Sequence, residues 1–243
     1  MPRPSGPGHR LLPKGIVIVY EDRDILVVDK PPGLLTIGTD KEKSRTAYFI
    51  LTDYVRKGQA KSRNRVFVVH RLDRDTSGIV VFAKTPEAKR FLQSRWDETT
   101  KKYLAVVHGT CKKTSETIST YLAENKARAV YSTSDTARGR LARTAYKVLK
   151  QTEEFALLEV DLLTGRKHQA RVHLAGIGHP VVGDDRYGRG KGAYKRLALH
   201  ATSISFIHPF SGKQVTFETT VPPYFSRLVG SFQQVAAPQE KAP

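Results

Sequence analysis

The sequence predicts an α+β fold in which a mostly antiparallel β-sheet is flanked by helices. Three observations carry this prediction. Short runs rich in β-branched and aromatic residues recur from residue 16 to residue 218, separated by polar turns. Four stretches with helical signals lie among them, without the regular strand–helix–strand alternation of a parallel sheet. No segment repeats at the period of a solenoid or a propeller.

The first elements are a hairpin and a helix. Ile16–Tyr20 and Ile25–Asp29 have the pattern of strands joined by a short polar turn. Lys30–Gly33 must leave the ladder, because its two prolines lack N–H donors. Thr46–Arg56 has helical spacing and is expected to stop at Gly58.

The later elements continue the sheet. Thr85 and Pro86 resemble an N-cap and a first helical turn, so a helix is predicted from Pro86 to about Trp96. Two further helices are expected at about Lys167–Ala175 and at Pro223–Phe232. The remaining strand candidates are Val68–Val69, Ile79–Phe82, Lys101–His108, Glu116–Tyr121, Ala129–Ser132, Thr144–Leu149, Phe155–Leu162, and a hairpin of Ile204–His208 with Gln214–Glu218.

The charge balance points to a polyanionic partner. Lys and Arg number 41 against 23 Asp and Glu, which gives a net charge of +18 and a pI near 10.0. Such an excess opposes compaction, so nucleic acid explains it better than a solvated surface without a partner. A membrane fits less well, because no window approaches 18 consecutive apolar residues. The basic run Lys57–Arg65 is expected to be a solvated or RNA-facing loop.

The ends of the chain suggest its organisation. Residues 1–14 are basic and rich in Pro and Gly without an apolar core, which predicts a disordered arm instead of a secretory signal. Cys111 is the single cysteine, so we expect no internal disulfide and a reducing, cytoplasmic compartment, with a mitochondrial location left open. Residues 15–228 are expected to form one domain, and residues 229–243 a loose C-terminal tail.

The segment HRLDRDTSG, residues 70–78, interrupts two apolar runs with a polar loop. An ionised Asp73 beside cations can act as a nucleophile or a base, although a lone Asp in a loop more often has a turn or capping role. A protein-kinase catalytic loop is rejected, because the residue five positions after Asp73 is Gly78 instead of Asn. Neither a Gly-rich phosphate loop nor Asp-Phe-Gly is present.

The segment HRLDRDTSGIVVFAKT, residues 70–85, resembles the signature of the RluA-type pseudouridine synthases. Four further segments agree and follow the family's order: KKYLAVVHG at 101–109, LTGRKHQARVHL at 163–174, GHP to GD at 178–184, and LHA at 199–201. The resemblance covers roughly Gly15 to Phe225. Many members carry a small S4-type RNA-binding domain before this region, and we expect targeting here to come from the catalytic domain itself.

The resemblance implies an enzyme that isomerises uridine in RNA, around a central RNA-binding cleft, without a metal or an organic cofactor. Asp73 would be the essential carboxylate, attacking the anomeric carbon or removing a ribose proton; the sequence leaves both routes open. Tyr103 would pack against the target base. Arg171 would pair with Asp73 and keep it ionised, which predicts that the two side chains approach within about 4 Å. The competing reading is a non-catalytic RNA-binding or chaperone protein on the same fold.

The RNA partner is expected to be a stem-loop of tRNA or rRNA, bound by a monomer. Arg71 is assigned to the space that a flipped base leaves in a stem. The expected RNA contacts are His70, Arg71, Arg74, Thr76, Arg166, Lys167 and His168. Further basic residues near the third motif, which could grip phosphates, are Arg186, Arg189, Lys191, Lys195 and Arg196.

Three further features of the sequence have interpretations that are less well supported. His168, Arg171 and His173 suggest a metal site, but no adequate ligand set with a carboxylate is evident, so none is predicted. Asp184 and Asp185 resemble paired glycosidase carboxylates, yet a turn or cap role is expected because adjacent side chains on an extended chain point apart. The basic segment 112–143 is interpreted as a candidate substrate-specific insertion.

Overall fold

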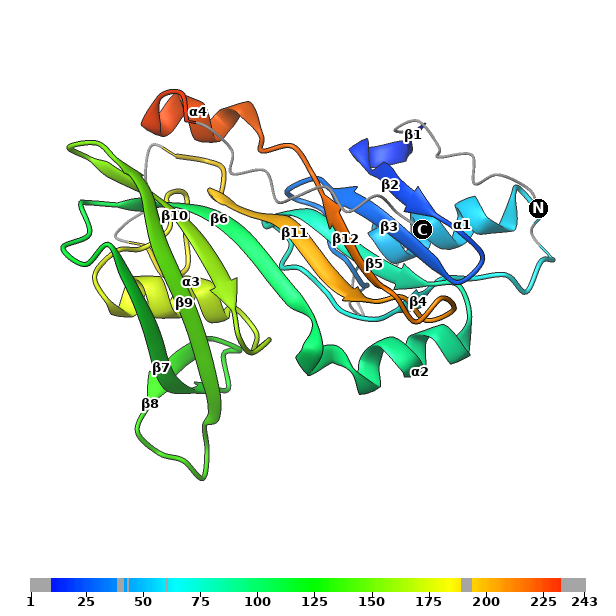
Figure 1. Cartoon of the computed structure of the whole chain (residues 1–243), viewed down its shortest axis with the longest axis horizontal. Coiled ribbons are helices and arrows are strands. Elements are labelled where there is room, and N and C mark those ends of the chain that lie inside the picture. Colours follow the sequence, from blue (N-terminus) through cyan, green and yellow to red (C-terminus); the bar gives the residue numbers. More distant parts are fainter. Residues whose placement is uncertain (1–9, 39–41, 43, 60, 189–193, 233–243) are drawn as a thin grey trace. The chain divides into compact units, whose positions relative to one another are not determined.

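The computed structural model describes residues 10–38, 42, 44–59, 61–188 and 194–232. Contacts divide the chain into two compact units. Unit 1 contains the described residues up to Thr99 together with Ser203–Thr219, and unit 2 contains Thr100–Thr202 together with the described residues from Thr220. The predicted α+β class is confirmed, since every strand ladder detailed below is antiparallel and helices accompany the strands in each unit (Figure 1).

The strands of unit 1 form where its apolar sequence runs lie. Its ladders pair β1 with β2, β2 with β3, β3 with β5, β4 with β5, and the end of β11 with β12. All seven residues of β5 are buried, which explains why this strand has no polar alternation. The bounds are β1 Arg10–Leu11, β2 Val17–Glu21, β3 Ile25–Lys30, β4 Phe67–Val68, β5 Ser77–Ala83, β11 Leu199–Ile207 and β12 Gln214–Glu218.

Both helices of unit 1 begin at a threonine cap. In α1 (Ala47–Arg56) the Thr46 hydroxyl accepts from the N–H of Phe49, and in α2 (Pro86–Ser94) the Thr85 hydroxyl accepts from Ala88. The predicted end of α2 at Trp96 was two residues too late. Arg95 leaves the helical conformation, and Trp96–Glu98 form a separate 3-10 turn.

Unit 2 is built on a sheet ordered β6-β10-β9-β7-β8. Helix α3 packs on β7, β8 and β9, and α4 packs on β6 and β10 (Figure 1). The segment 112–143 supplies β7, β8 and the start of β9, and its Leu122, Val130 and Ala142 form a buried cluster with Val172. This segment is therefore part of the sheet and core of unit 2, and its interpretation as a substrate-specific insertion stays a prediction. The bounds are β6 Thr100–His108, β7 Ser115–Glu124, β8 Val130–Thr133, β9 Arg140–Gln151, β10 Phe155–Leu162, α3 Gln169–Gly176 and α4 Pro223–Val229.

The ends of the chain differ from their prediction. Within the expected arm 1–14, Arg10-Leu11 form β1 against β2 and a 3-10 turn begins at Pro13; residues 1–9 lie outside the described part. The expected tail 229–243 starts inside α4, because Val229 is the last helical residue and is buried; residues 233–243 lie outside the described part. None of the described helices is long and apolar enough to cross a membrane.

Candidate active site

The loop that carries Asp73 lies between β4 and β5 in unit 1, and its backbone is fixed just before the aspartate. Thr36, which is 2% exposed, donates its hydroxyl to the carbonyl of Leu72 at 2.9 Å and accepts the N–H of Leu72 at 3.2 Å. The side chain of Leu72 is buried as well. The N–H and the carbonyl of Leu72, the residue before Asp73, therefore both have hydrogen-bond partners, while the side chain of Asp73 is only partly buried.

Lys30, the last residue of β3, fixes the same loop just after the aspartate. Its side chain is fully buried, and its ammonium donates to the carbonyls of Arg74 at 3.1 Å, Leu34 at 2.8 Å and Pro31 at 2.9 Å. Burial lowers the pKa of Lys30 to about 7, against the opposing effect of the carboxylates of Asp75, Asp73 and Asp29. The lysine thus ties two loops together at the base of the Asp73 turn.

The other predicted RNA contacts of this loop fall into two groups. Arg71 and Arg74 are exposed, and Arg74 pairs with Glu42 at 2.7 Å. His70 accepts the N–H of Val81 on its Nε2 at 3.0 Å, and its ring lies 4.6 Å from the ring of Trp96. Thr76 is only 2% exposed. The positions of His70 and Thr76 fit a role in holding the loop more closely than a direct RNA contact, which stays a prediction.

In unit 2, Arg171 on α3 makes a buried bidentate pair with Asp184. Its Nε lies 2.7 Å from Oδ2 and its Nη2 lies 2.8 Å from Oδ1. Burial alone would raise the pKa of Asp184, but the hydrogen bonds and charge of Arg171, with the N–H groups of Tyr187 and Arg186, hold it below its usual value. Those two N–H groups also show Asp184 in the expected turn role. The expected approach of Arg171 to Asp73 stays a prediction.

Tyr187 extends this pair into a network. Its ring lies 5.1 Å below the guanidinium carbon of Arg171, and its hydroxyl is 2.7 Å from Nδ1 of His168. The same hydroxyl accepts the N–H of Val130 on β8 at 3.2 Å. The orientation of Arg171 is therefore fixed by a carboxylate on one side and a ring on another.

Tyr103, on β6, is 8% exposed and is paired across the sheet with Val160 of β10.

Gln169 holds the turn that precedes α3. Its side-chain oxygen accepts the N–H of Arg166 at 3.0 Å and the hydroxyl of Thr164 at 2.6 Å. Its amide nitrogen donates to the carbonyl of Arg143 and the hydroxyl of Thr144, each at 2.9 Å. A buried glutamine with four partners explains how His168 can take the left-handed conformation (φ 54°) that starts the helix.

A basic cavity of about 320 Å³ lies beside this turn. Arg166 and Lys167 line it from the turn, Arg138 lines it from the β8–β9 connection and Arg140 from the start of β9, against one carboxylate, Glu124. Lys167 binds Glu124 at 2.5 Å, and the side chain of Arg138 is 80% exposed. This excess of cations fits the predicted phosphate contacts of Arg166 and Lys167. Of the other basic residues named for this role, Arg189 and Lys191 lie outside the described part.

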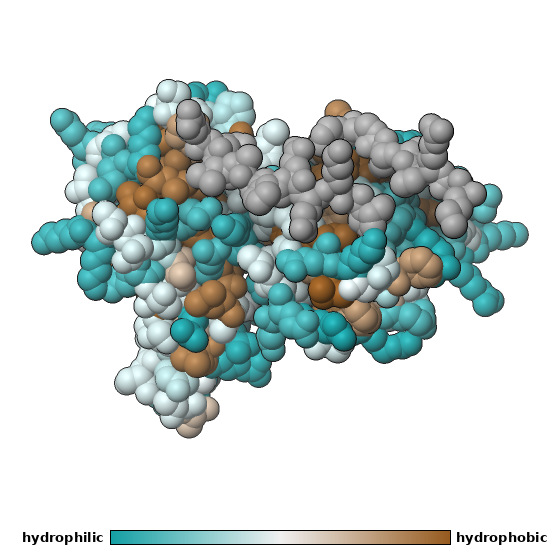
Figure 2. All heavy atoms as spheres, viewed as in Figure 1, coloured by the Kyte–Doolittle hydropathy of each residue, from teal (hydrophilic) through white to brown (hydrophobic). Residues whose placement is uncertain are grey.

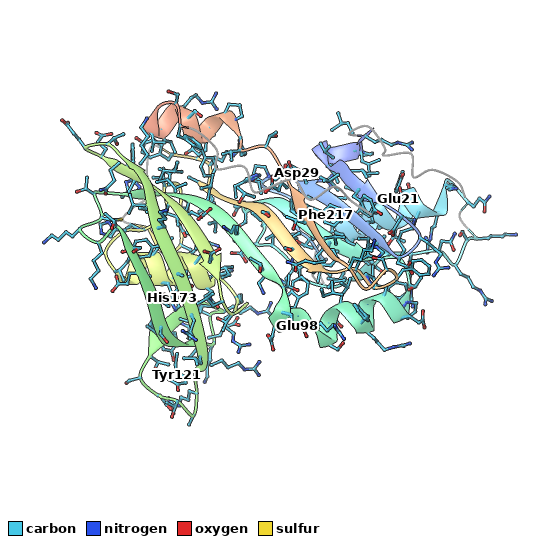
Figure 3. All side chains as sticks on the ribbon, in the orientation of Figure 1. Glu21, Asp29, Glu98, Tyr121, His173 and Phe217 are labelled. Carbon is cyan, nitrogen blue, oxygen red and sulfur yellow. The ribbon has the colours of Figure 1, made fainter. Side chains whose placement is uncertain are left out.

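His173 has a structural environment. Its two ring nitrogens lie 2.9 Å from the hydroxyl of Thr144 and 3.0 Å from that of Thr120, and the label in Figure 3 places it on α3 beside the strands. Burial lowers its pKa to about 4. No group of three or more His, Cys, Asp or Glu able to hold a metal ion is found among the described residues.

Comparison with known proteins identifies the family. Residues 24–176 match the RNA pseudouridylate synthase family. The chain is 38% identical over 222 residues to an uncharacterised RNA pseudouridine synthase of Mycoplasma genitalium, covering 88% of this chain and 69% of the relative. It is 34% identical to the ribosomal large subunit pseudouridine synthase D of Zymomonas mobilis, covering 91% and 74%. The chain belongs to the RluA-type RNA pseudouridine synthases and is an RNA isomerase.

Solved structures agree on the fold. The human RNA pseudouridylate synthase domain containing 1 superposes with a TM-score of 0.70 at 28% identity, covering 88% of this chain and 86% of that one. The human RNA pseudouridylate synthase domain containing 4 superposes with a TM-score of 0.72 at 22% identity, covering 86% and 89%.

Sequence reasoning missed the roles of Lys30, Thr36 and Gln169, since each acts through contacts with residues distant in the sequence or on the next loop.

Proposed function

We propose that this enzyme converts uridine to pseudouridine in structured RNA without a metal or organic cofactor, with Asp73 as the essential carboxylate. The observation that carries the proposal is the anchoring of the Asp73 loop. Thr36 binds the residue before the aspartate, and Lys30 binds the residue after it. A carboxylate whose backbone is fixed on both sides while its side chain stays partly exposed is preorganised to meet a substrate.

The reaction is an isomerisation and needs no external oxidant or reductant. The bond from the ribose anomeric carbon to N1 of uracil breaks, the base turns, and a bond from that carbon to C5 forms. The proton lost from C5 and the proton gained at N1 keep the composition unchanged. Asp73 acts either by attacking the anomeric carbon or by removing a ribose proton, and both routes need its ionised form. We also assign Tyr103 to packing against the target base and Arg171 to pairing with Asp73.

For the substrate we propose ribosomal RNA of the large subunit, with tRNA as the alternative. Relatives whose names state a substrate include the ribosomal large subunit pseudouridine synthases of Zymomonas mobilis and Vibrio cholerae, at 34% and 33% identity. The cationic cavity of unit 2 supports a substrate with closely spaced phosphates. Pseudouridine mapping of rRNA and tRNA from cells with and without this protein tests the choice. Loss of a site in tRNA alone would contradict it.

Asp73→Asn tests the catalytic assignment, because the substitution keeps the shape of the side chain and removes its charge. Turnover should fall below detection while RNA affinity stays within about threefold of the original. Asp97→Asn is the matched control: Asp97 is exposed on the 3-10 turn Trp96–Glu98 of the same unit, so its substitution removes a carboxylate charge and should leave turnover unchanged. Substantial turnover by Asp73→Asn would show that Asp73 is not the essential group.

A further inference from the structure

The end of unit 1 opposite the Asp73 loop contains a second basic cavity, of about 780 Å³. It lies where β1, the β2–β3 turn, the end of β5 and the C-terminal end of α1 meet, and hydrophilic residues gather over this end of α1 in Figure 2. Two carboxylates line it, Glu21 and Asp53. The cations that line it are Arg10, Arg23, Lys57, Arg65 and Lys84.

One of the two carboxylates is already neutralised inside the protein. Glu21, labelled in Figure 3 near α1, accepts from the ammonium of Lys84 at 2.7 Å and from the hydroxyl of Tyr54 at 2.7 Å. Both charged side chains of this pair are about a quarter exposed. The cavity therefore presents Arg10, Arg23, Lys57 and Arg65 against Asp53, and Nε of Arg23 also lies 3.5 Å from Asp24, which still leaves a local excess of positive charge.

Three of these arginines are positioned by aromatic rings. The guanidinium carbon of Arg10 lies 5.2 Å from the ring centre of Tyr54, that of Arg23 lies 4.9 Å from Phe210, and that of Arg65 lies 5.0 Å from Phe67. A ring beside a guanidinium restricts its position, while the guanidinium has several N–H groups, so those not used within the protein can bind phosphate oxygens. A cation that only water solvates has no need of a ring to position it, so these contacts favour a bound anion.

The two ends of unit 1 are well separated. Strand β5 leaves the Asp73 loop at Ser77 and ends at Ala83, next to Lys84 of the cavity. The neighbouring strand β3 runs between the same two ends in the opposite direction. Lys30, at the Asp73 loop, pairs with Gly78, and Ile25, near the cavity, pairs with Ala83. Six residue steps along a strand span roughly 20 Å. A phosphate in the cavity therefore belongs to a nucleotide several positions away from the one that reaches Asp73.

We propose that this cavity binds the phosphate backbone of the substrate RNA as a second anchor, outside the nucleotides that enter the active site. The inference rests on the proposed function, because the RNA is the substrate of the same enzyme. It also gives the basic run Lys57–Arg65 a role, since Lys57 and Arg65 are the lining residues at its two ends. An acidic protein partner is the competing occupant.

The test compares two RNAs and two charge-matched variants. The short RNA is the smallest stem-loop that contains the mapped uridine, and the long RNA is the same stem-loop with its natural flanking helices. The variant R23Q/R65Q removes two cations from the cavity. The control R90Q/K113Q removes two exposed cations elsewhere, from the surface pairs Arg90–Glu87 and Lys113–Glu116. Each variant is measured for its melting temperature, its affinity for both RNAs, and turnover.

R23Q/R65Q should weaken binding of the long RNA by about tenfold and reduce its salt slope by about 2, with little change for the short RNA. R90Q/K113Q should affect both RNAs equally and weakly. Equal affinities of R23Q/R65Q and the control for the long RNA would overturn the anchor, and would leave an acidic protein as the occupant to be considered. Failure of the proposed function has a different signature, namely no turnover of either RNA by the unaltered enzyme.

Discussion

Asp184→Asn should destabilise the protein strongly although Asp184 lies outside the predicted catalytic set. The carboxylate is 4% exposed and accepts from two nitrogens of Arg171 and from the N–H groups of Arg186 and Tyr187. In asparagine one oxygen becomes an NH₂ group, which meets a guanidinium N–H instead of accepting from it. Removing one member of a buried ion pair typically costs about 3 to 5 kcal/mol, and we expect about 3 kcal/mol here because the other oxygen keeps its partners.

Urea unfolding at pH 7 measures this cost directly. Asp185→Asn is the matched control, because Asp185 is the next residue and is exposed; its change should lie within about 0.5 kcal/mol. Turnover by Asp184→Asn should fall even where the protein is fully folded, since the carboxylate orients the guanidinium of Arg171. A loss of stability below about 1 kcal/mol would refute the view that this pair fixes Arg171.

The remaining predictions concern charge, metal, base flipping and pH. If about six phosphates are neutralised, RNA affinity should fall by roughly four to five decades for a tenfold rise in salt, and a flat titration would contradict the electrostatic argument. Turnover should persist in EDTA while the RNA stays folded; a loss that zinc restores would contradict the absence of a metal cofactor. Arg71→Ala should reduce turnover more on a uridine in a stable stem than on an unpaired one, and equal losses would exclude the wedge role. Burial lowers the pKa of His173 from 6.5 to about 4, so the unfolded chain takes up a proton first and stability is lost as pH falls from 6.5 to 4. This loss is worth about 3 kcal/mol, and in acid-dependent urea unfolding His173→Gln should flatten it.

The sequence predicts strands well where turn residues mark both ends. The bounds of β10 and β12 agree with the prediction to the residue, because Phe155–Leu162 and Gln214–Glu218 are flanked by turn residues. Strand β9 begins at Arg140, four residues before its predicted start. Its first four residues include two exposed arginines, Arg140 and Arg143, and only Ala142 of that stretch is buried, so the alternation carries almost no apolar signal.

The motifs identify the loops of the candidate site, but they do not reveal what holds those loops. Gln169 and Thr36 have short polar side chains of a kind usually expected at the surface, and only their distant partners explain their burial. The link between Leu72 and Thr36 joins residues 36 positions apart. No periodic pattern encodes such a contact, because it depends on the register in which β3 and β5 pair.

Lys30 changes the electrostatic argument made from the sequence. The family resemblance implies one permanent cation for Asp73, namely Arg171, because a carboxylate removed from water needs a partner. Lys30 lies in the same unit as Asp73, and burial lowers its pKa to about 7 while Asp75, Asp73 and Asp29 oppose that change. These carboxylates raise the pKa of Lys30 because they attract its ammonium form. The ammonium form of Lys30, which a pKa of about 7 makes only partly populated at neutral pH, donates to the carbonyl of Arg74 and so supplements any contribution from Arg171. A lysine in the segment DKPPG would ordinarily be assigned to solvent, and only its three carbonyl partners, one of them in the Asp73 loop, explain its full burial.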